Sequence, residues 1–361
     1  MNQNSVIGDI RPDPTRTDPV LIVPYMWIGD FVRGHSAVRL LKERWPNRPV
    51  DLLSTTLCAP LADYMPGVRQ AIVYDLPRGR IALDKQKELA AVLRQQGYKT
   101  ALMMPRTWKS ALAPTLAGIP ERIGFIGEAR FGVVTDLRWG ERALPRMVDK
   151  MAALVLPAGA VREARDWPMP QLEVPKAEIA TWRAKNGLGE GPAIALAPGA
   201  VGPSKRWTYY AEAARELAQR GFDIWVVGGP GEKQQAAEIV AAGGARVRDL
   251  TGTDLRNGIL ALAAAAEVIS NDSGLLHVAG AIGTPSIGIF GPTSPYHWAP
   301  LNGLAATMKR ATNLPCQPCH KPICTAYDHH CMRDITTKEV VDTALEVIAE
   351  KTQNRPVPVS T

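Results

Sequence analysis

The stretch EVISNDSGLLHVAGAIGTPSIGIFGP, residues 267–292, decides the fold of this chain. It opens with a short apolar run that ends at Asp272, continues with an apolar segment of helical length, and closes with a second apolar run over 285–292. Short apolar runs are typical of strands buried on both faces, and parallel strands need a helical crossover between them. The stretch therefore predicts one βαβ unit of an α/β domain.

The same alternation extends backwards from this unit through the second half of the chain. A final amphipathic pattern follows it and predicts one more helix. In order, the expected elements are a helix at 177–186, a strand at 193–199, a helix at 207–220, a strand at 222–229, helices at 233–242 and 256–266, and the last helix at 336–350.

The first half repeats the pattern, with strands expected at 19–25, 50–55, 71–76 and 100–105. We therefore predict an α/β fold of two doubly wound, Rossmann-like domains, 19–169 and 176–335, that face each other across a central cleft. A flexible lead-in over 1–18 precedes them, and PQLEVPK (170–176) links them. In such sheets ligands bind beyond the carboxyl ends of the strands.

The composition suits two globular domains and excludes several other classes of protein. The chain has 361 residues, of which 46% are hydrophobic, which is too many for a disordered protein. No run reaches the roughly 18 apolar residues needed to span a bilayer, and the N-terminus has no signal-peptide core. We therefore expect a cytoplasmic protein.

The positive charge is concentrated in the first half of the chain. Residues 20–168 contain 22 Lys and Arg against 14 Asp and Glu, whereas residues 169–361 contain 18 of each. A basic half suggests a nucleic acid, an anionic membrane surface or a phosphorylated substrate as partner, unless the charges only solvate helix faces. No recognisable nucleic-acid module is present, so we expect no nucleic-acid partner.

The DSG motif after the strand at 267–272 is a candidate anion site. Ser273 and Gly274 open the next helix, where free backbone N–H groups attract phosphate, and Gly274 permits close approach. His277, one turn later, is placed to reach the same anion. The alternative is that Asp272 or Ser273 only caps the helix.

Two further loops follow strands in the second half. APGAVGPSKRW (197–207) carries Lys205, whose ammonium group can offset charge on a leaving phosphate. GGPGEK (228–233) combines close backbone approach with Glu232, which suits ribose hydroxyls. Neither loop is a Walker sequence or a GxGxxG motif, so we predict neither an ATPase nor an NAD site.

In the first half, Asp30 lies where the first strand gives way to the first helix. A carboxylate there is placed to take a proton from an attacking hydroxyl, although a helix cap is the alternative.

Four cations in or near the candidate cleft loops are expected to bind phosphate on an acceptor, or else to be ordinary surface charges; they are Arg33, Arg106, Lys109 and Arg130.

Four of the five cysteines form the cluster C-x2-C-x4-C-x6-C, at Cys316, Cys319, Cys324 and Cys331. This spacing is compatible with a structural Zn²⁺ site, with a disulfide or with free thiols. The sequence lacks a DxD motif, so we expect no catalytic metal.

Together these segments resemble the lipopolysaccharide heptosyltransferase family, and most of all its heptosyltransferase II branch, from about residue 19 to residue 350. The segments that carry the resemblance are WIGDF, MPRTWKSALAPTLAGIPERIGFIGEARFG (104–132), PGAVGPSKRW, GGPGEK, NDSGLLHVAGAIGTPSIGIFGPTSP (271–295) and the late cysteines. The resemblance implies a GT-B fold, in which the last helix, 336–350, packs back on the first half of the chain. It also implies an inverting transfer of heptose from ADP-heptose without a required cofactor or catalytic metal. The acceptor would be phosphorylated heptose-Kdo-lipid A at the cytoplasmic face of the inner membrane.

By position, the resemblance implies that Asp30 is the catalytic base and that Lys205 holds the diphosphate. The nucleotide-sugar loop would comprise Asp272, Ser273, Gly274, Leu275 and His277. Glu232 falls near the ribose-binding acid of the family. Some relatives carry hydroxyl residues early in the 197–207 loop where this chain has Gly199 and Ala200, so backbone groups and Ser204 would serve instead.

Three alternatives remain open at this point. The first is a heptosyltransferase I, which performs the same chemistry on Kdo. The second is a nucleotide-sugar epimerase, which has the same double-Rossmann fold. The third is a carbohydrate-binding protein without enzymatic activity. An epimerase would turn over ADP-heptose without an acceptor.

Overall fold

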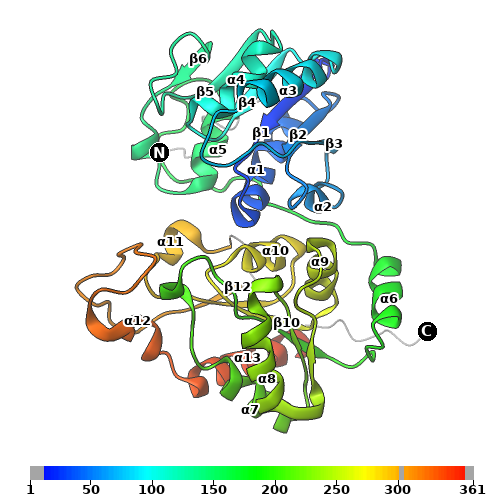
Figure 1. The fold of residues 1–361 in the computed structure, drawn as a ribbon, viewed down its shortest axis with the longest axis vertical. Helices are drawn as coiled ribbons and strands as arrows, with labels where there is room; N and C mark the ends of the chain where they lie inside the picture. Colours follow the sequence, from blue (N-terminus) through cyan, green and yellow to red (C-terminus); the bar gives the residue numbers. More distant parts are fainter. Residues whose placement is uncertain (1–11, 301–304, 354–361) are drawn as a thin grey trace. The chain divides into compact units, whose positions relative to one another are not determined.

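The computed structural model describes residues 12–300 and 305–353. The chain forms two compact units, and it passes from one to the other between Glu173 and Val174. Each unit is a six-stranded parallel sheet with helices on both faces (Figure 1). Each unit therefore has the layered α/β architecture that the alternating pattern predicts.

The sheet of the first unit has the order β3-β2-β1-β4-β5-β6. The chain thus starts in the middle of the sheet, builds outward to one edge, returns to the middle and builds to the other edge. The strands are β1 (Val20–Val23), β2 (Val50–Ser54), β3 (Val68–Val73), β4 (Thr100–Met103), β5 (Glu121–Phe125) and β6 (Asp136–Arg138). The helices are α1 (Ile28–Arg44), α2 (Ala59–Ala62), α3 (Leu83–Gln95), α4 (Trp108–Leu116) and α5 (Met147–Val155).

Alternating side chains of the central strands supply a core on each face of this sheet. Leu21 and Val23 of β1 pack in one cluster with residues of α3 and α4, such as Leu89 and Ala111. Helices α1 and α5 pack against each other, and α5 also contacts β4 and β5. Because side chains alternate across a strand, all four residues of β1 are buried.

A buried histidine ties α1 to the end of the first unit. His35 Nδ1 accepts a hydrogen bond from the Gln171 amide at 2.9 Å, and its Nε2 lies 2.8 Å from the Pro66 carbonyl oxygen. The amide can only donate and the carbonyl can only accept, so the ring is the neutral Nε2–H tautomer. Burial lowers the pKa of His35 to about 4.

Part of the predicted lead-in is held against the first unit. Its residues 1–11 lie outside the described residues. Arg16 pairs with Glu121 at 3.1 Å, and Asp18 pairs with the buried Arg48 at 2.7 Å. Residues 16–18 are therefore fixed by charged partners that the local sequence gives no reason to expect.

The second unit repeats the same topology, with the order β12-β11-β10-β7-β8-β9. Its first strand, β7, and its fourth, β10, are the central pair, as β1 and β4 are in the first unit. The strands are β7 (Ala193–Ala197), β8 (Asp223–Val226), β9 (Val247–Asp249), β10 (Glu267–Asn271), β11 (Ser286–Ile289) and β12 (Ala305–Met308). The helices are α6 (Lys176–Lys185), α7 (Tyr210–Gln219), α8 (Lys233–Gly243), α9 (Leu255–Ala264), α10 (Gly274–Ile282), α11 (Pro295–Trp298), α12 (His330–Arg333) and α13 (Thr337–Gln353).

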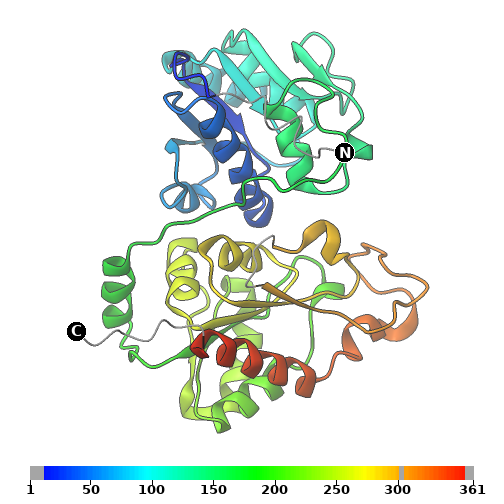
Figure 2. The same cartoon turned by 180° about the vertical axis from the view of Figure 1, so that it is seen from behind.

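The C-terminal helix belongs to the core of the second unit. Val340, Val341 and Ala344 of α13 are fully buried in one cluster with Ile269 and Ile287 of the sheet. Figure 2 shows this helix in red, and it packs on α7, β10 and β11. The apolar stripe of α13 is thus buried within the helix's own unit.

Candidate functional site

The carboxyl end of β1 places Asp30 in the first turn of α1. The N-cap of this helix is Trp27, which makes no side-chain cap hydrogen bond, so Asp30 lies three residues inside the helix and does not cap it. Its carboxylate oxygen Oδ1 lies 2.5 Å from Arg33 Nη2, one turn further along α1. The ion pair with Arg33 orients the Asp30 carboxylate. The side chain is 18% exposed, so the carboxylate remains partly open to a ligand.

Two residues that the sequence did not single out share the surroundings of Asp30. Tyr25, just after β1, is half-buried, and burial together with the Glu141 carboxylate raises the pKa of its hydroxyl to about 12. Asp30 adds to this shift, whereas Arg106 and Arg130 oppose it. The segments after β1, β4, β5 and β6 therefore bring two carboxylates, two guanidinium groups and a phenol near one another. Sequence offers no signal for Glu141, which follows the edge strand β6.

The four cations expected to bind an acceptor have different surroundings. Arg33 is held by Asp30, as described above. Arg106 is half exposed and pairs with Glu141 at 3.1 Å. Lys109, at the start of α4, donates to the Pro77 carbonyl, and partial burial lowers its pKa. Arg106 is therefore exposed and Lys109 is half-buried, whereas Arg33 and Arg130 are buried.

Arg130 is a correction to the expected acceptor site. Its side chain is fully buried, and its guanidinium donates to the main-chain carbonyls of Pro105, at 3.0 Å, and Phe125. Burial lowers its pKa. Arg130 thus fastens the loop after β4 to the end of β5. Its position in the sequence, near a strand-end loop, does not show that the side chain points into the core.

A pocket of about 240 Å³ opens at the carboxyl edge of the first sheet. Its lining comes from the segments that follow β1, β2, β3 and β4. Most of the lining is apolar, and the polar groups include Thr55, Tyr74, Arg78, Gln86, Thr107 and Lys109. The pocket lies where ligands bind in sheets of this order, between oppositely directed crossovers.

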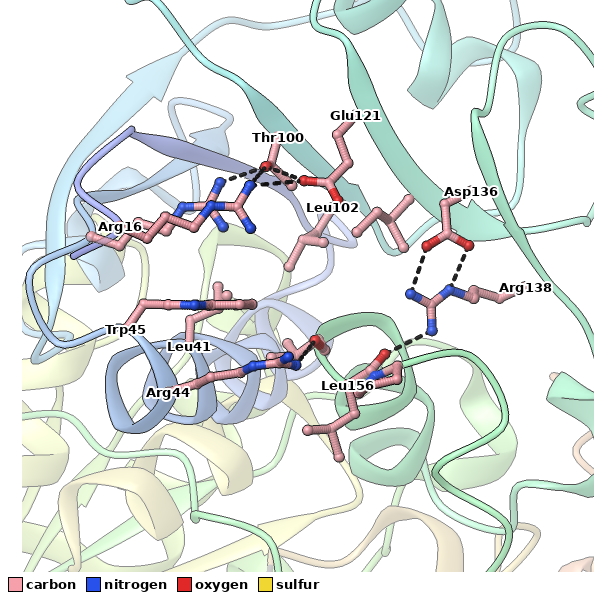
Figure 3. Close-up of a pocket in the computed structure, with 14 residues that line it drawn as sticks. Arg16, Leu41, Arg44, Trp45, Thr100, Leu102, Glu121, Asp136, Arg138 and Leu156 are labelled. Carbon is pink, nitrogen blue, oxygen red and sulfur yellow. Dashed lines mark hydrogen bonds and ion pairs between the residues drawn. The ribbon is translucent and has the colours of Figure 1, made fainter. Parts of the chain in front are cut away.

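A second pocket, of about 180 Å³, lies at the opposite, amino-terminal edge of the same sheet (Figure 3). Arginines dominate its wall, but carboxylates or main-chain oxygens occupy them. Arg138 pairs with Asp136 at 2.7 Å, and Arg44 lies over the Trp45 ring and 3.5 Å from the Val155 carbonyl. Part of the positive excess of the first half is therefore used in packing, away from the carboxyl edge.

In the second unit the structure brings Lys205 and Asp272 together. Lys205 ends the 3-10 turn Pro203–Lys205 in the loop after β7, and Asp272 follows β10 directly. Because β7 and β10 are neighbours, Lys205 Nζ lies 2.7 Å from Asp272 Oδ2. The lysine side chain is 29% exposed and the aspartate 7%, so the ammonium group is the more accessible of the two.

The N-terminus of α10 adjoins this ion pair. Ser273 is the N-cap, but its side chain makes no cap hydrogen bond and lies instead 3.0 Å from Ser270 Oγ. The first backbone N–H groups of α10 are therefore not satisfied by the cap residue, as an anion site requires. Gly274 and Leu275 are half-buried at this end, and His277 is buried one turn further on.

The loops after β7 and β8 contact each other through Gly199 and Glu232. A Cβ atom on Gly199 would lie 2.8 Å from the Glu232 carboxyl carbon, so a side chain at position 199 would displace the Glu232 carboxylate. Glu232 Oε2 accepts a hydrogen bond from the Gly229 amide at 2.8 Å, so the turn Pro230–Glu232 orients the carboxylate. The predicted ribose-binding acid thus lies beside the predicted diphosphate loop.

Asn271 fixes the loop that carries Lys205, and sequence reasoning missed it. Its side chain is fully buried, donates to the Pro198 carbonyl at 2.7 Å, and accepts from the Trp207 amide at 3.0 Å. One amide at the end of β10 therefore holds both ends of the 198–207 loop. The residue precedes the DSG motif, but an asparagine there carries no sequence signal for this role.

Ser204 has a different place from the one expected. It is 3% exposed, and its hydroxyl donates to the Lys321 carbonyl rather than facing an open site. The residue joins the Lys205 loop to the cysteine segment. We therefore withdraw Ser204 as a direct donor ligand.

The four clustered cysteines line a small cavity of about 30 Å³ and are free thiols. Burial, together with the other three thiols, raises the pKa of Cys331 to about 11. Within the described residues no group of three or more His, Cys, Asp or Glu side chains is arranged to hold a metal ion.

Comparison with known proteins identifies the family. Residues 87–329 match the sequence profile of glycosyltransferase family 9 (heptosyltransferase). The chain belongs to this family, and it is a glycosyltransferase. It is 33% identical over 346 residues to lipopolysaccharide heptosyltransferase 2 of Salmonella typhimurium, covering 92% of this chain and 99% of the relative. It is 34% identical over 337 residues to lipopolysaccharide heptosyltransferase 2 of Escherichia coli, covering 90% and 96%.

The solved structures agree with this assignment. The structure of E. coli ADP-heptose lipopolysaccharide heptosyltransferase II superposes with a TM-score of 0.82 at 31% identity, covering 92% of this chain and 99% of that one. This family 9 enzyme therefore has the GT-B type of fold. Among its helices in the described part of the chain, none is both long and apolar enough to cross a bilayer.

Proposed function

We propose that this glycosyltransferase is a heptosyltransferase II, which moves heptose from ADP-heptose to the heptose of the lipopolysaccharide inner core with inversion. Relatives with that name share a third of their residues with it over nearly their whole length. The observation that carries the proposal is the Lys205–Asp272 pair beside the open N-terminus of α10. A cation and free N–H groups at the central strand ends suit a diphosphate.

On the donor side, Lys205 and the N–H groups around Ser273 and Gly274 bind the diphosphate of ADP-heptose. Glu232 accepts from the ribose hydroxyls. As the bond between the anomeric carbon and the diphosphate oxygen breaks, negative charge grows on that oxygen. Lys205 stabilises this charge, and Asp272 keeps the ammonium group in place until the diphosphate arrives.

On the acceptor side, Asp30 is the general base. Its carboxylate takes the proton of the acceptor heptose hydroxyl as that oxygen forms its bond to the anomeric carbon and ADP leaves. Arg33 orients the carboxylate through the 2.5 Å contact. No step requires a cofactor or a catalytic metal.

Arg106 and Lys109 bind phosphate on the acceptor, and the pocket at the carboxyl edge of the first sheet receives its less polar part. Guanidinium and ammonium groups both suit phosphate, the first through paired hydrogen bonds. The acceptor is anchored in a membrane, so we further propose that the enzyme works in the cytoplasm, loosely attached to the inner membrane.

A transfer assay with defined truncated acceptors tests the proposal. Lipopolysaccharide ending in one heptose should accept a second from ADP-heptose, whereas an acceptor ending in Kdo should not. Transfer to Kdo alone would identify a heptosyltransferase I instead. Conversion of ADP-heptose without any acceptor would identify an epimerase, and no turnover with any of the three would contradict the proposal.

A further inference from the structure

The cysteine segment, residues 316–331, forms hydrogen bonds with Ser204, the residue that precedes Lys205. All three polar groups of Ser204 bond to it: the amide donates to the Pro322 carbonyl at 3.1 Å, the hydroxyl donates to the Lys321 carbonyl, and the Ser204 carbonyl lies 2.6 Å from His329 Nε2. Because a carbonyl only accepts, His329 Nε2 carries the hydrogen. The turn that presents Lys205 is thus clamped from outside its own loop.

Packing adds to this clamp. Gly202, with φ of +91°, lies so close to Pro322 that a Cβ atom there would be 3.2 Å from its Cα. Lys205 in turn donates its amide to the Gly202 carbonyl at 3.1 Å. A shift of the Pro322 segment would therefore move the turn and the lysine together.

The backbone that carries His329 is held in an unfavourable conformation. Tyr327, Asp328 and His329 have φ angles of +54°, +40° and +61°, in the left-handed region that residues other than glycine rarely adopt. Arg333 pairs with Asp328 and fixes this turn. Strain of this kind persists only where the surroundings impose it, and it is frequent at functional sites.

We propose that His329 is a positioning residue for Lys205: its hydrogen bond to the Ser204 carbonyl holds the Pro203–Lys205 turn so that the ammonium group faces the diphosphate. The inference rests on the proposed role of Lys205 in the donor site. His329 does not touch the substrate, so its effect passes through the lysine. It gives the cysteine segment a function in the transfer reaction.

Glutamine and methionine at position 329 provide a matched test, because the two side chains have similar lengths and only glutamine can donate a hydrogen bond. We expect His329→Met to lower kcat about 10- to 100-fold, the loss typical of a displaced catalytic group, with a smaller change in the KM for ADP-heptose. His329→Gln should retain most of the activity. His330→Ala is the control, since the adjacent His330 pairs only with Asp334 on the exposed surface among the contacts of the described residues.

A double-mutant cycle separates positioning from general damage to the fold. In a Lys205→Ala background, His329→Met should have little further effect, because the group that it positions is gone. Losses that multiply in the double variant, or a His329→Met enzyme as fast as wild type beside a slow Lys205→Ala enzyme, would overturn the inference alone. A fully active Lys205→Ala enzyme would overturn the proposed donor site and the inference with it.

Discussion

At the scale of single residues, the pairing of Asp30 with Arg33 decides what the base can do. Asp30→Asn keeps the size and the place in α1 but cannot take a proton. We expect turnover to fall about 10²- to 10⁴-fold, the usual contribution of a positioned base, while ADP-heptose binding is retained. Transfer kinetics and donor titration check this. Asp84→Asn, in the first turn of α3, is the control, and normal turnover in Asp30→Asn would remove Asp30 from the mechanism.

Arg130 leads to the opposite expectation, an effect on stability. Arg130→Ala leaves the buried Phe125 carbonyl without this donor, whereas the Pro105 carbonyl keeps its hydrogen bond from Ser110 Oγ. The unsatisfied carbonyl costs about 1–3 kcal/mol, and the truncation leaves a cavity in place of a fully buried side chain, so the free energy of unfolding should fall by several kcal/mol. Arg106→Ala should change it by less than about 1 kcal/mol, since its ion pair is exposed. Urea denaturation of both variants measures the difference; equal stabilities would show that Arg130 does not fasten the loop.

The residues of the donor site were more predictable than those around Asp30, for a physical reason. Lys205 and Asp272 each lie in a loop that follows a strand recognisable in the sequence, and a doubly wound sheet brings the ends of its central strands together. Tyr25 and Glu141 have no such marker, because neither lies in a motif and their meeting depends on the path of the chain after β6. Arg130 was misread because charge near a loop does not show which way a side chain points.

At the scale of elements, Asn271 shows how a strand end can organise a neighbouring loop. Asn271→Ala removes the donor to the Pro198 carbonyl and the acceptor for the Trp207 amide, both in buried surroundings. We expect about 2–4 kcal/mol lower stability and a weaker affinity for ADP-heptose, because the loop that carries Lys205 loses both tethers. Thermal melting and donor titration test this, with Asn47→Ala on the exposed surface as control. Unchanged donor affinity would mean that the loop keeps its shape unaided.

Two strands at the sheet edges, β6 and β9, were not revealed by the sequence. The central strands β1 and β7 are continuous apolar runs, which is what burial on two faces demands. The edge strands β6 and β9 have three residues each, with Asp and Arg in both, so no apolar run marks them. Helix α4 contains Pro114, which concealed a helical segment that packs well on α3.

At the scale of the whole molecule, the two units share one strand order but not one charge. The first carries the positive excess, and the accessible part of it at the carboxyl edge includes Arg106 and Lys109. Removing both should raise the acceptor KM several-fold and leave the donor KM nearly unchanged, and added salt should do the same, since charges are screened beyond about 8 Å at physiological ionic strength. The double variant Lys85→Ala/Lys87→Ala, on the exposed face of α3, removes equal charge as a control. An acceptor KM indifferent to salt and to the Arg106 and Lys109 changes would show that the acceptor is recognised through its sugars.

The buried His35 makes the stability of the first unit depend on pH. Its pKa is lowered from 6.5 to about 4 by burial, so the unfolded chain binds a proton that the folded chain resists between these values. The stabilisation is fully present above pH 6.5 and is lost as the pH falls toward 4, by about 3 kcal/mol over the window. Urea denaturation from pH 4.5 to 7.5 should show wild type losing more stability on acidification than His35→Gln. Parallel pH profiles would contradict this.

The bond between His35 and the Gln171 amide also bears on how the enzyme is synthesised. Helix α1 leaves the ribosome early, yet one acceptor of its buried histidine stays empty until the last residues of the first unit have followed, more than a hundred residues later. The first unit can therefore complete this contact only when its own translation is complete. Because domains fold as units, N-terminal first, we expect the first unit to complete its buried contacts while the second unit is being synthesised.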